Sequence, residues 1–263
     1  MVRRRPLQLM KVAICISGQP RNYEKGYLEL KKWFLDKYDC DVYIHTWRDD
    51  VPMEAGHKYV KERKYECTDD DYKSIVELYK PKTWHYQKPI PFDTTDIKGP
   101  HIGYKLNSAL SASYSIHACY NLVRSFGIEY DLVIRTRFDL EFTDYISPEC
   151  LFLKDLSLLD SNKLNVFEYP MNPEGSPTRL SEVDDLFAVS SPEIAGIYAD
   201  YFTYVISYVY MNDAYKSWLD KNISENADPI YPESLLKYHL VTNGVEINPI
   251  KSLTEHFTAN ILR

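Results

Sequence analysis

Two acidic residues lie close together in the segment 130–142, which reads YDLVIRTRFDLEF. Asp139 and Glu141 are two positions apart, so on an extended chain both side chains point to the same side. Carboxylate oxygens are ligands that Mg²⁺ and Mn²⁺ prefer, and a cation held by them can bridge the phosphates of a nucleotide. The D-x-E spacing therefore predicts a divalent-cation site, although alternating acids on a solvated strand produce the same pattern.

Two arginines precede these acids at alternate positions. Arg135 and Arg137 follow the apolar run Leu132–Ile134, which is typical of a buried strand rather than an amphipathic one. Guanidinium groups form strong, charge-assisted hydrogen bonds with phosphates and carboxylates. This context favours the functional interpretation of the acidic pair, as part of a site for phosphate and metal.

Polar residues also follow two other apolar runs. The run 11–17 leads into SGQPR at 17–21, and the run 41–47 ends in HTWR at 45–48. In an open parallel sheet, ligands bind beyond the carboxyl ends of the strands. The three polar strand ends together predict one pocket for a phosphorylated ligand.

Three further residues are candidates for contact with that ligand. His45 and Trp47 share one face of their strand, where Trp47 either stacks on a base or sugar or caps the sheet by packing. Lys105 lies near the start of a predicted long helix, whose first amide groups can also bind an anion.

The hydrophobic pattern distributes these residues over alternating strands and helices. Strands are predicted at 11–17, 41–47, 83–87, 132–134, 164–169, 186–189 and 245–248, and helices at 23–38, 71–79, 104–126, 192–211 and 232–243. The first strand, helix and strand form a βαβ unit, which implies parallel strands with a right-handed crossover. The pattern predicts an α/β domain with a mostly parallel central sheet flanked by helices.

Composition limits the class of protein. The chain has 263 residues and a formal net charge of −7, so it lacks the basic surplus that binds nucleic acid or anionic lipid. No apolar stretch approaches the roughly 20 residues of a membrane span. The five cysteines are odd in number and widely spaced, which favours a reducing compartment, and we expect a soluble, cytoplasmic protein.

The expected organisation is a flexible tail at 1–10 followed by a single domain at 11–263. The nucleotide-sugar half would cover about 11–142 and the acceptor half about 143–263. No G-x-G-x-x-G motif follows the first strand, which argues against a Rossmann dehydrogenase.

Three segments in this order, AICISGQPRNY at 13–23, VYIHTW at 42–47 and YDLVIRTRFD at 130–139, resemble a known family. They are similar to small glycosyltransferases of the GT-A fold, which use nucleotide sugars and occur in large DNA viruses and bacterial surface-polysaccharide gene clusters. The resemblance runs from about 11 to 246 and implies a GT-A-like, Rossmann-like fold with a D-x-D-type metal site. Asp139 and Glu141 stand where its acids stand, with Glu replacing the last Asp. The residues implied to line the nucleotide pocket are Ser17, Gly18, Gln19 and Arg21.

Transfer with inversion needs a carboxylate that takes the proton from the acceptor hydroxyl. Asp184 and Asp185 are the leading candidates, because they lie between a Pro/Gly/Ser-rich loop and a predicted strand. Glu233 is the second candidate, although a Glu after Pro at a helix start also suits the helix dipole. His256 is a candidate for contact with the metal or diphosphate, with a packing role as the alternative. A retaining enzyme, which needs no such base, stays open.

The sequence thus predicts a hexosyl- or pentosyltransferase that uses a nucleoside-diphosphate sugar with Mn²⁺ or Mg²⁺. The resemblance implies uridine as the base, and the expected acceptor is a glycan or glycoprotein. One alternative is a sugar nucleotidyltransferase, for which SGQPR is a poor match because it contains a single glycine. The other is a non-catalytic carbohydrate-binding protein.

Overall fold

The structure is a computed structural model. It describes residues 10–48, 53–54, 64–65, 67–93, 100–142, 155–167, 183, 185–211, 213–222, 229–250 and 259–261. At 53–54, 64–65, 100–105, 167, 211, 250 and 259–261 only the backbone is described.

A seven-stranded sheet forms the centre of the molecule, in the order β10-β8-β9-β6-β1-β2-β5. Its strands are β1 (Lys11–Gly18), β2 (Asp39–Trp47), β5 (Thr83–Gln87), β6 (Leu132–Thr136), β8 (Leu164–Phe167), β9 (Ala188–Ser190) and β10 (Ile247–Ile250). β9 runs antiparallel to both of its neighbours, and the other neighbouring pairs in this sheet are parallel. Two small antiparallel pairs join β3 (Met53–Glu54) to β4 (Lys64–Tyr65) and β7 (Leu140–Phe142) to β11 (Ala259–Ile261).

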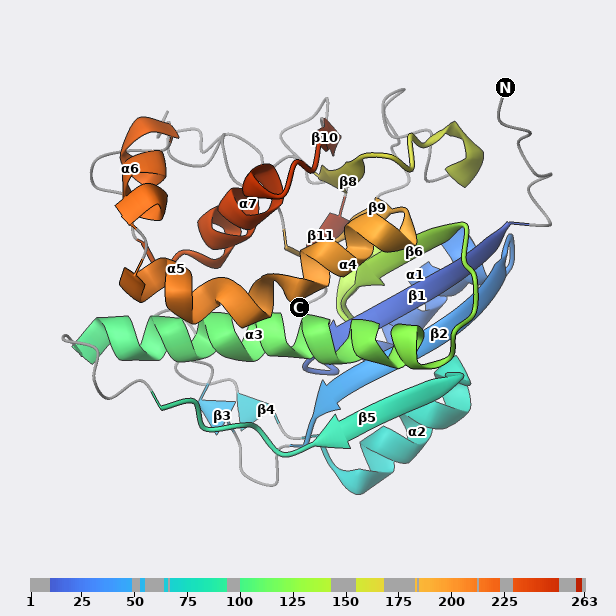
Figure 1. Cartoon of the computed structure of the whole chain (residues 1–263). Coiled ribbons are helices and arrows are strands. Elements are labelled where there is room, and N and C mark those ends of the chain that lie inside the picture. The colour runs from blue at the N-terminus through green and yellow to red at the C-terminus, as the bar shows by residue number, and fades with distance from the viewer. Residues whose placement is uncertain are drawn as a thin grey trace.

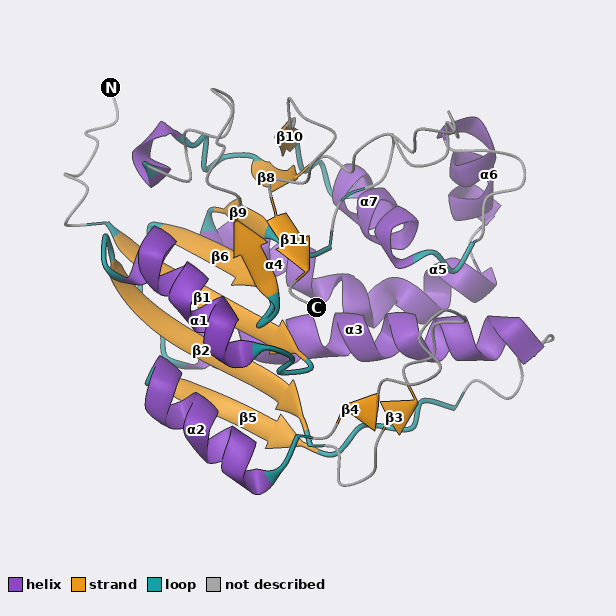
Figure 2. Ribbon diagram, turned by 180° about the vertical axis from the view of Figure 1, so that it is seen from behind, coloured by secondary structure: helices purple, strands orange, loops and turns teal. Residues whose placement is uncertain are grey.

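Helices cover both faces of this sheet (Figure 1). α1 (Tyr23–Leu30), extended by a π-type turn at Lys31–Leu35, and α2 (Asp69–Tyr79) lie on one face; α3 (Pro100–Ser125) and α4 (Pro192–Asp200) lie on the other (Figure 2). Short 3₁₀ turns occupy Leu156–Leu158 and Tyr201–Tyr204, and α5 (Val205–Met211), α6 (Asp213–Asn222) and α7 (Pro232–Thr242) complete the helical layer beside α3. The expected α/β class, with a mostly parallel sheet between helices, is confirmed.

Burial on both faces explains the apolar first strand. In β1, Ala13 and Cys15 pack into the core beneath α3 and α4, whereas Val12, Ile14 and Ile16 pack into the core beneath α1 and α2. Successive side chains of a strand point to opposite faces, so a strand covered on both sides needs apolar residues at nearly every position.

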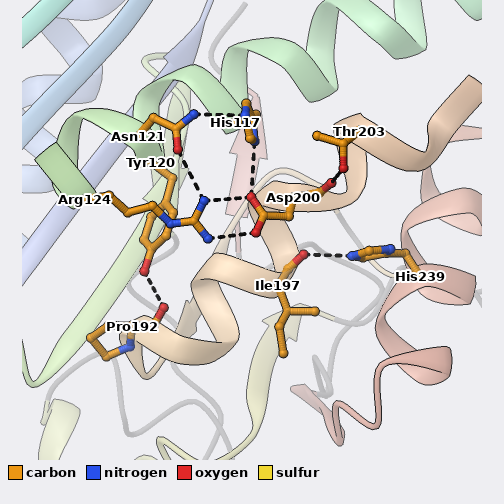
Figure 3. A network of polar contacts seen from close by, with 9 residues as sticks. All are labelled: His117, Tyr120, Asn121, Arg124, Pro192, Ile197, Asp200, Thr203 and His239. Carbon is orange, nitrogen blue, oxygen red and sulfur yellow. Dashed lines mark hydrogen bonds and ion pairs between the residues drawn. The ribbon is translucent and has the colours of Figure 1, made fainter.

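Polar contacts attach α4 to the long helix α3, and α7 to α4 (Figure 3). Arg124 of α3 forms two hydrogen bonds of 2.8 Å with the carboxylate of Asp200, and this partner lowers the pKa of Asp200. His239 of α7 donates from Nε2 to the carbonyl oxygen of Ile197 in α4 at 3.0 Å. The Tyr120 hydroxyl donates to the Pro192 carbonyl. These bonds fix the helical layer that covers one face of β1 and β6.

Most predicted elements exist with small shifts in their ends. The strand at 83–87 is confirmed as β5, α3 begins at Pro100 rather than 104, and β9 begins at Ala188 rather than 186. The helix predicted at 192–211 is interrupted by the 3₁₀ turn at Tyr201–Tyr204. The helix α6 and the short strands β3, β4, β7 and β11 were not predicted.

The central sheet takes strands from both expected halves of the chain. β1, β2, β5 and β6 come from the first half, and β8, β9 and β10 from the second. The expected tail at 1–10 lies outside the described residues except for Met10. Within the described chain, no helix is both long enough and apolar enough to cross a membrane.

Candidate functional site

The three polar strand ends lie on adjacent strands, as the sequence predicted. In the parallel register, Ser17 of β1 is paired with His45 of β2, and Gly18 with Thr46. On the other side of β1, Cys15 is paired with Arg135 of β6. The amino-terminal half of α3 and the helices α5 to α7 extend beyond these carboxyl ends in both views (Figures 1 and 2). This edge of the sheet is the candidate site.

The turn after β1 is shaped by a glycine and by local hydrogen bonds. Gly18 has φ of +111°, a conformation that residues with a Cβ rarely adopt. Its carbonyl oxygen accepts a hydrogen bond of 2.8 Å from the Thr46 hydroxyl of β2. The Arg21 side chain donates to the Gln19 side chain, and the backbone N–H of Arg21 donates to the carbonyl of Gln19 at 2.9 Å. The predicted nucleotide-binding segment is therefore a compact turn tied to β2.

His45 is enclosed by other side chains. Its side chain is fully buried, its Nδ1 lies 2.8 Å from the Ser115 hydroxyl of α3, and its ring packs 4.9 Å from that of Trp47. Burial, with a smaller contribution from His85, lowers the pKa of His45 to about 3. The ring is consequently neutral at physiological pH and reaches a ligand only if the surrounding side chains move.

Trp47 packs as the cap of its strand. It is 3% exposed, and its ring stacks on Tyr114 of α3 with centroids 5.6 Å apart. Of the two roles that the sequence left open, this arrangement favours packing over a platform for a base or sugar.

Asp139 is held by Arg137 in a buried ion pair. Arg137 Nε lies 2.8 Å from Asp139 Oδ1, and Arg137 Nη2 lies 2.9 Å from Oδ2. The side chain of Asp139 is 0% exposed. Both carboxylate oxygens that were predicted to bind a cation thus accept hydrogen bonds from the neighbouring arginine.

Asp139 and Glu141 do not lie on one extended strand. β6 ends at Thr136, residues 138 and 139 form a turn, and Glu141 lies in the separate strand β7, where it is exposed. The expectation that both acids project from the same side of a continuous strand is wrong, because the turn between β6 and β7 interrupts the alternation.

The carboxylate chemistry of a cation site is present, but the described residues do not assemble a full ligand set. Nowhere in the described part of the chain do three or more His, Cys, Asp or Glu side chains form a group that could hold a metal ion. His256 and Asp184 lie outside the described residues. A cation at Asp139 would share the carboxylate with Arg137 or displace it, because each oxygen already accepts one hydrogen bond.

Helix α1 packs directly on the turn that carries Asp139, through a glycine that the sequence interpretation did not single out. A Cβ added to Gly26 would lie 1.7 Å from the Phe138 carbonyl oxygen. A glycine in the middle of a helical pattern is a signal of such close approach. Gly26 therefore sets the position of the Arg137–Asp139 pair relative to α1.

Arg135 and Ser17 face a small cavity on the side of α3 and α4. The cavity gives the centre of a water-sized molecule about 20 Å³ of room, and both residues line it. Ser17 is 2% exposed and Arg135 is 9% exposed. A space of this size does not admit a nucleotide, so the predicted contact of these two side chains with a nucleotide sugar is not supported in this conformation.

The candidate bases are only partly described. Asp185 is half-buried in a bend before β9, and its negative charge, after burial itself, raises the pKa of the buried Tyr201. Glu233 lies in the first turn of α7, directly after Pro232, where a carboxylate interacts favourably with the helix dipole. Lys105 is described in its backbone alone, within α3.

Fold and site together define an α/β protein with a compact polar site at the carboxyl edge of a mostly parallel sheet. No protein-family model matches the chain, and no curated protein matches it. Among solved structures, it is similar to the crystal structure of mouse xyloside xylosyltransferase 1 in its apo form. That likeness has a TM-score of 0.43 and 7% sequence identity, and covers 93% of this chain and 85% of the other. Function has to be inferred from the residues of the site.

Proposed function

We propose that the chain is a glycosyltransferase that moves a sugar from a nucleoside-diphosphate sugar, with uridine as the base, to a glycan or glycoprotein acceptor. The observation that carries the proposal is the register of the sheet. It brings the turn after Ser17, the end of β2 and the Arg137–Asp139 turn after β6 to one edge. These are the segments on which the resemblance to GT-A glycosyltransferases rests.

The turn at 18–21 is assigned to the donor. Gly18 allows the backbone to approach a ligand closely, and Gln19 and Arg21 present an amide and a guanidinium group beside it. Arg21 can form charge-assisted hydrogen bonds with a diphosphate oxygen, which distinguishes this turn from a purely structural one.

Asp139 is assigned to a divalent cation, Mn²⁺ or Mg²⁺, with Glu141 two residues further along the chain. When bound, such a cation stabilises the charge that develops on the departing nucleoside diphosphate. Arg137 holds the Asp139 carboxylate in one orientation before the donor arrives. Once released from that carboxylate, its guanidinium can bind the donor phosphates.

Asp185 is assigned as the general base of a direct displacement. A half-buried carboxylate in a bend can accept the proton of an acceptor hydroxyl while the new glycosidic bond forms at the sugar carbon. Asp184 and Glu233 are the alternative bases. Glu233, in the first turn of α7, also suits a second role, interaction with the helix dipole.

Release of nucleoside diphosphate from a panel of nucleotide sugars tests this proposal, because transferases slowly hydrolyse their own donors. We expect release from one donor with Mn²⁺ and none after chelation. Asp139→Asn keeps the shape of the side chain and should reduce release at least about 100-fold, as removal of a charge-stabilising group does. Asp36→Asn, an exposed surface exchange, is the matched control and should behave as wild type.

Each contrary result has a definite meaning. Circular dichroism of Asp139→Asn separates loss of activity from loss of the fold. Wild-type rates in a folded Asp139→Asn protein would refute the assignment of the cation site. Absence of both release and nucleotide binding across the panel would refute the glycosyltransferase and leave a carbohydrate-binding protein. Pyrophosphate release from a nucleoside triphosphate and a sugar 1-phosphate would identify a nucleotidyltransferase.

A further inference from the structure

The cavity beneath α3 and α4 combines an apolar wall with one buried positive charge. Its lining residues come from strands β1, β6, β8 and β9 and from helices α3 and α4. Most of its lining is aliphatic or aromatic, and Arg135 is the charged residue that lines it. The cavity therefore has the chemistry of an anion site rather than of a purely apolar void.

Arg135 has donors with no acceptor. Its Nε and Nη1 atoms, and the Ser17 hydroxyl, are buried and form no hydrogen bond with any residue of the described chain. A guanidinium group keeps its charge under all conditions in which proteins fold, so it cannot escape burial by losing a proton. Burying such a charge without a counter-charge is costly, and the fold is expected to supply one.

The other polar groups that line the cavity do not supply a counter-charge for Arg135. The Ser190 hydroxyl donates to the Ser191 carbonyl at 3.1 Å, and the Tyr120 hydroxyl donates to the Pro192 carbonyl. A hydrogen bond with Cys119, and then burial, raise the pKa of the Cys15 thiol, which stays neutral. The ion pairs found among the described residues include none to Arg135.

We propose that this cavity binds one halide-sized monovalent anion, chloride in the cell, between Arg135 and Ser17. The available room of about 20 Å³ for the centre of a water-sized molecule accommodates a single small ion and not a nucleotide. The anion neutralises the guanidinium and accepts the hydrogen bonds of Nε, Nη1 and the Ser17 hydroxyl. The site is independent of the proposed transferase reaction.

The test is thermal stability at constant ionic strength, with sodium gluconate replaced stepwise by sodium chloride. Constant ionic strength keeps the screening of surface charges unchanged. We expect saturating chloride to raise the melting temperature of the wild type by about 2–4 °C, with bromide acting similarly. Arg135→Met should remove this dependence and melt in gluconate at or above the wild-type temperature, because it removes a buried charge that forms no ion pair within the described chain.

Two further variants and a bromide-soaked crystal complete the test of the chloride site. Ser17→Ala should weaken chloride binding several-fold without abolishing it, because one of three donors is lost. Arg124→Met, at the half-exposed surface of α3, should destabilise the protein but keep the chloride dependence. Crystals soaked in bromide should show an anomalous peak beside Arg135, which reports on the site even if Arg135→Met fails to fold.

Three results would overturn the proposal. One is a wild-type melting temperature that does not respond to halide. Another is a bromide-soaked crystal with water but no anomalous peak in the cavity. In the third, uridine diphosphate stabilises the wild type and chloride does not, and the stabilisation by uridine diphosphate disappears in Arg135→Met. That outcome would assign Arg135 to the nucleotide site instead.

Discussion

At the residue scale, four of the polar side chains selected from the sequence are turned inward. Ser17, His45, Arg135 and Asp139 are all buried, and each lies at or just after the end of a strand covered by helices on both faces. Burial changes their chemistry: His45 is held neutral, Asp139 is paired with Arg137, and Arg135 forms no hydrogen bond from Nε or Nη1 within the described chain. The edge of the sheet is therefore a rigid polar layer beneath the site.

The neutral state of His45 makes stability depend on pH. Its pKa is about 3 in the fold, against about 6.5 in an unfolded chain, so below pH 6.5 the unfolded state binds the proton first. The contribution of neutral His45 to the free energy of unfolding is complete above pH 6.5 and is lost as the pH falls towards 3. We expect His45 alone to lower the free energy of unfolding by about 3 kcal/mol between pH 7.5 and 4.5, measured by urea titration of the wild type against His45→Asn.

His45→Asn has no titrating group and should reduce this slope, whatever its stability at pH 7.5. His239, whose pKa burial also lowers, contributes with the same sign, so a shallower dependence should persist in the variant. An unchanged slope in His45→Asn would contradict the buried, neutral histidine.

At the element scale, the position of α1 decides where the Arg137–Asp139 turn lies. Gly26 brings the helix onto the Phe138 carbonyl, with no room for a Cβ. Alanine normally stabilises a helix relative to glycine by about 0.5–1 kcal/mol. At this position α1 must move away from the turn instead, and we expect Gly26→Ala to cost about 3 kcal/mol in urea unfolding.

Gly196→Ala in α4 is the matched control. There the added Cβ would lie 2.8 Å from Nη2 of Arg124, the far end of a flexible side chain that can shift. Its stability should stay within about 1 kcal/mol of the wild type. Equal stability of the two variants would show that α1 is not pressed against the turn.

The sequence predicts some elements well for physical reasons. β1 is apolar from Val12 to Ile16 because both its faces are covered, and α7 begins with Pro232 at a first-turn position that suits proline. β7 was missed because it is short and pairs with β11, more than a hundred residues later in the chain. α6 was missed because few of its residues are buried. The turn at 138–139, which separates Asp139 from Glu141, has no signal in its own segment; Gly26, far away in the sequence, packs against the Phe138 carbonyl.

At the scale of the whole molecule, the central sheet interleaves the two halves of the chain. β9, from the second half, inserts between β6 of the first half and β8 of the second. α3, from the first half, is covered by α4 and attached to it by the Arg124–Asp200 pair (Figure 3). A half corresponding to 11–142 would leave one edge of β6 and the outer face of α3 uncovered, so neither half is expected to fold alone.

We therefore expect one cooperative unfolding transition. In a Trp218→Phe variant, tryptophan fluorescence reports on Trp33, Trp47 and Trp84 of the first half, while far-UV circular dichroism includes the helices α4 to α7 of the second. Because the shared sheet couples the halves, the two signals should give coincident urea transitions. A fragment of residues 1–142 should show no cooperative transition. Two separated transitions, or a fragment that unfolds cooperatively, would mean that the halves are independent and that the site lies between two domains.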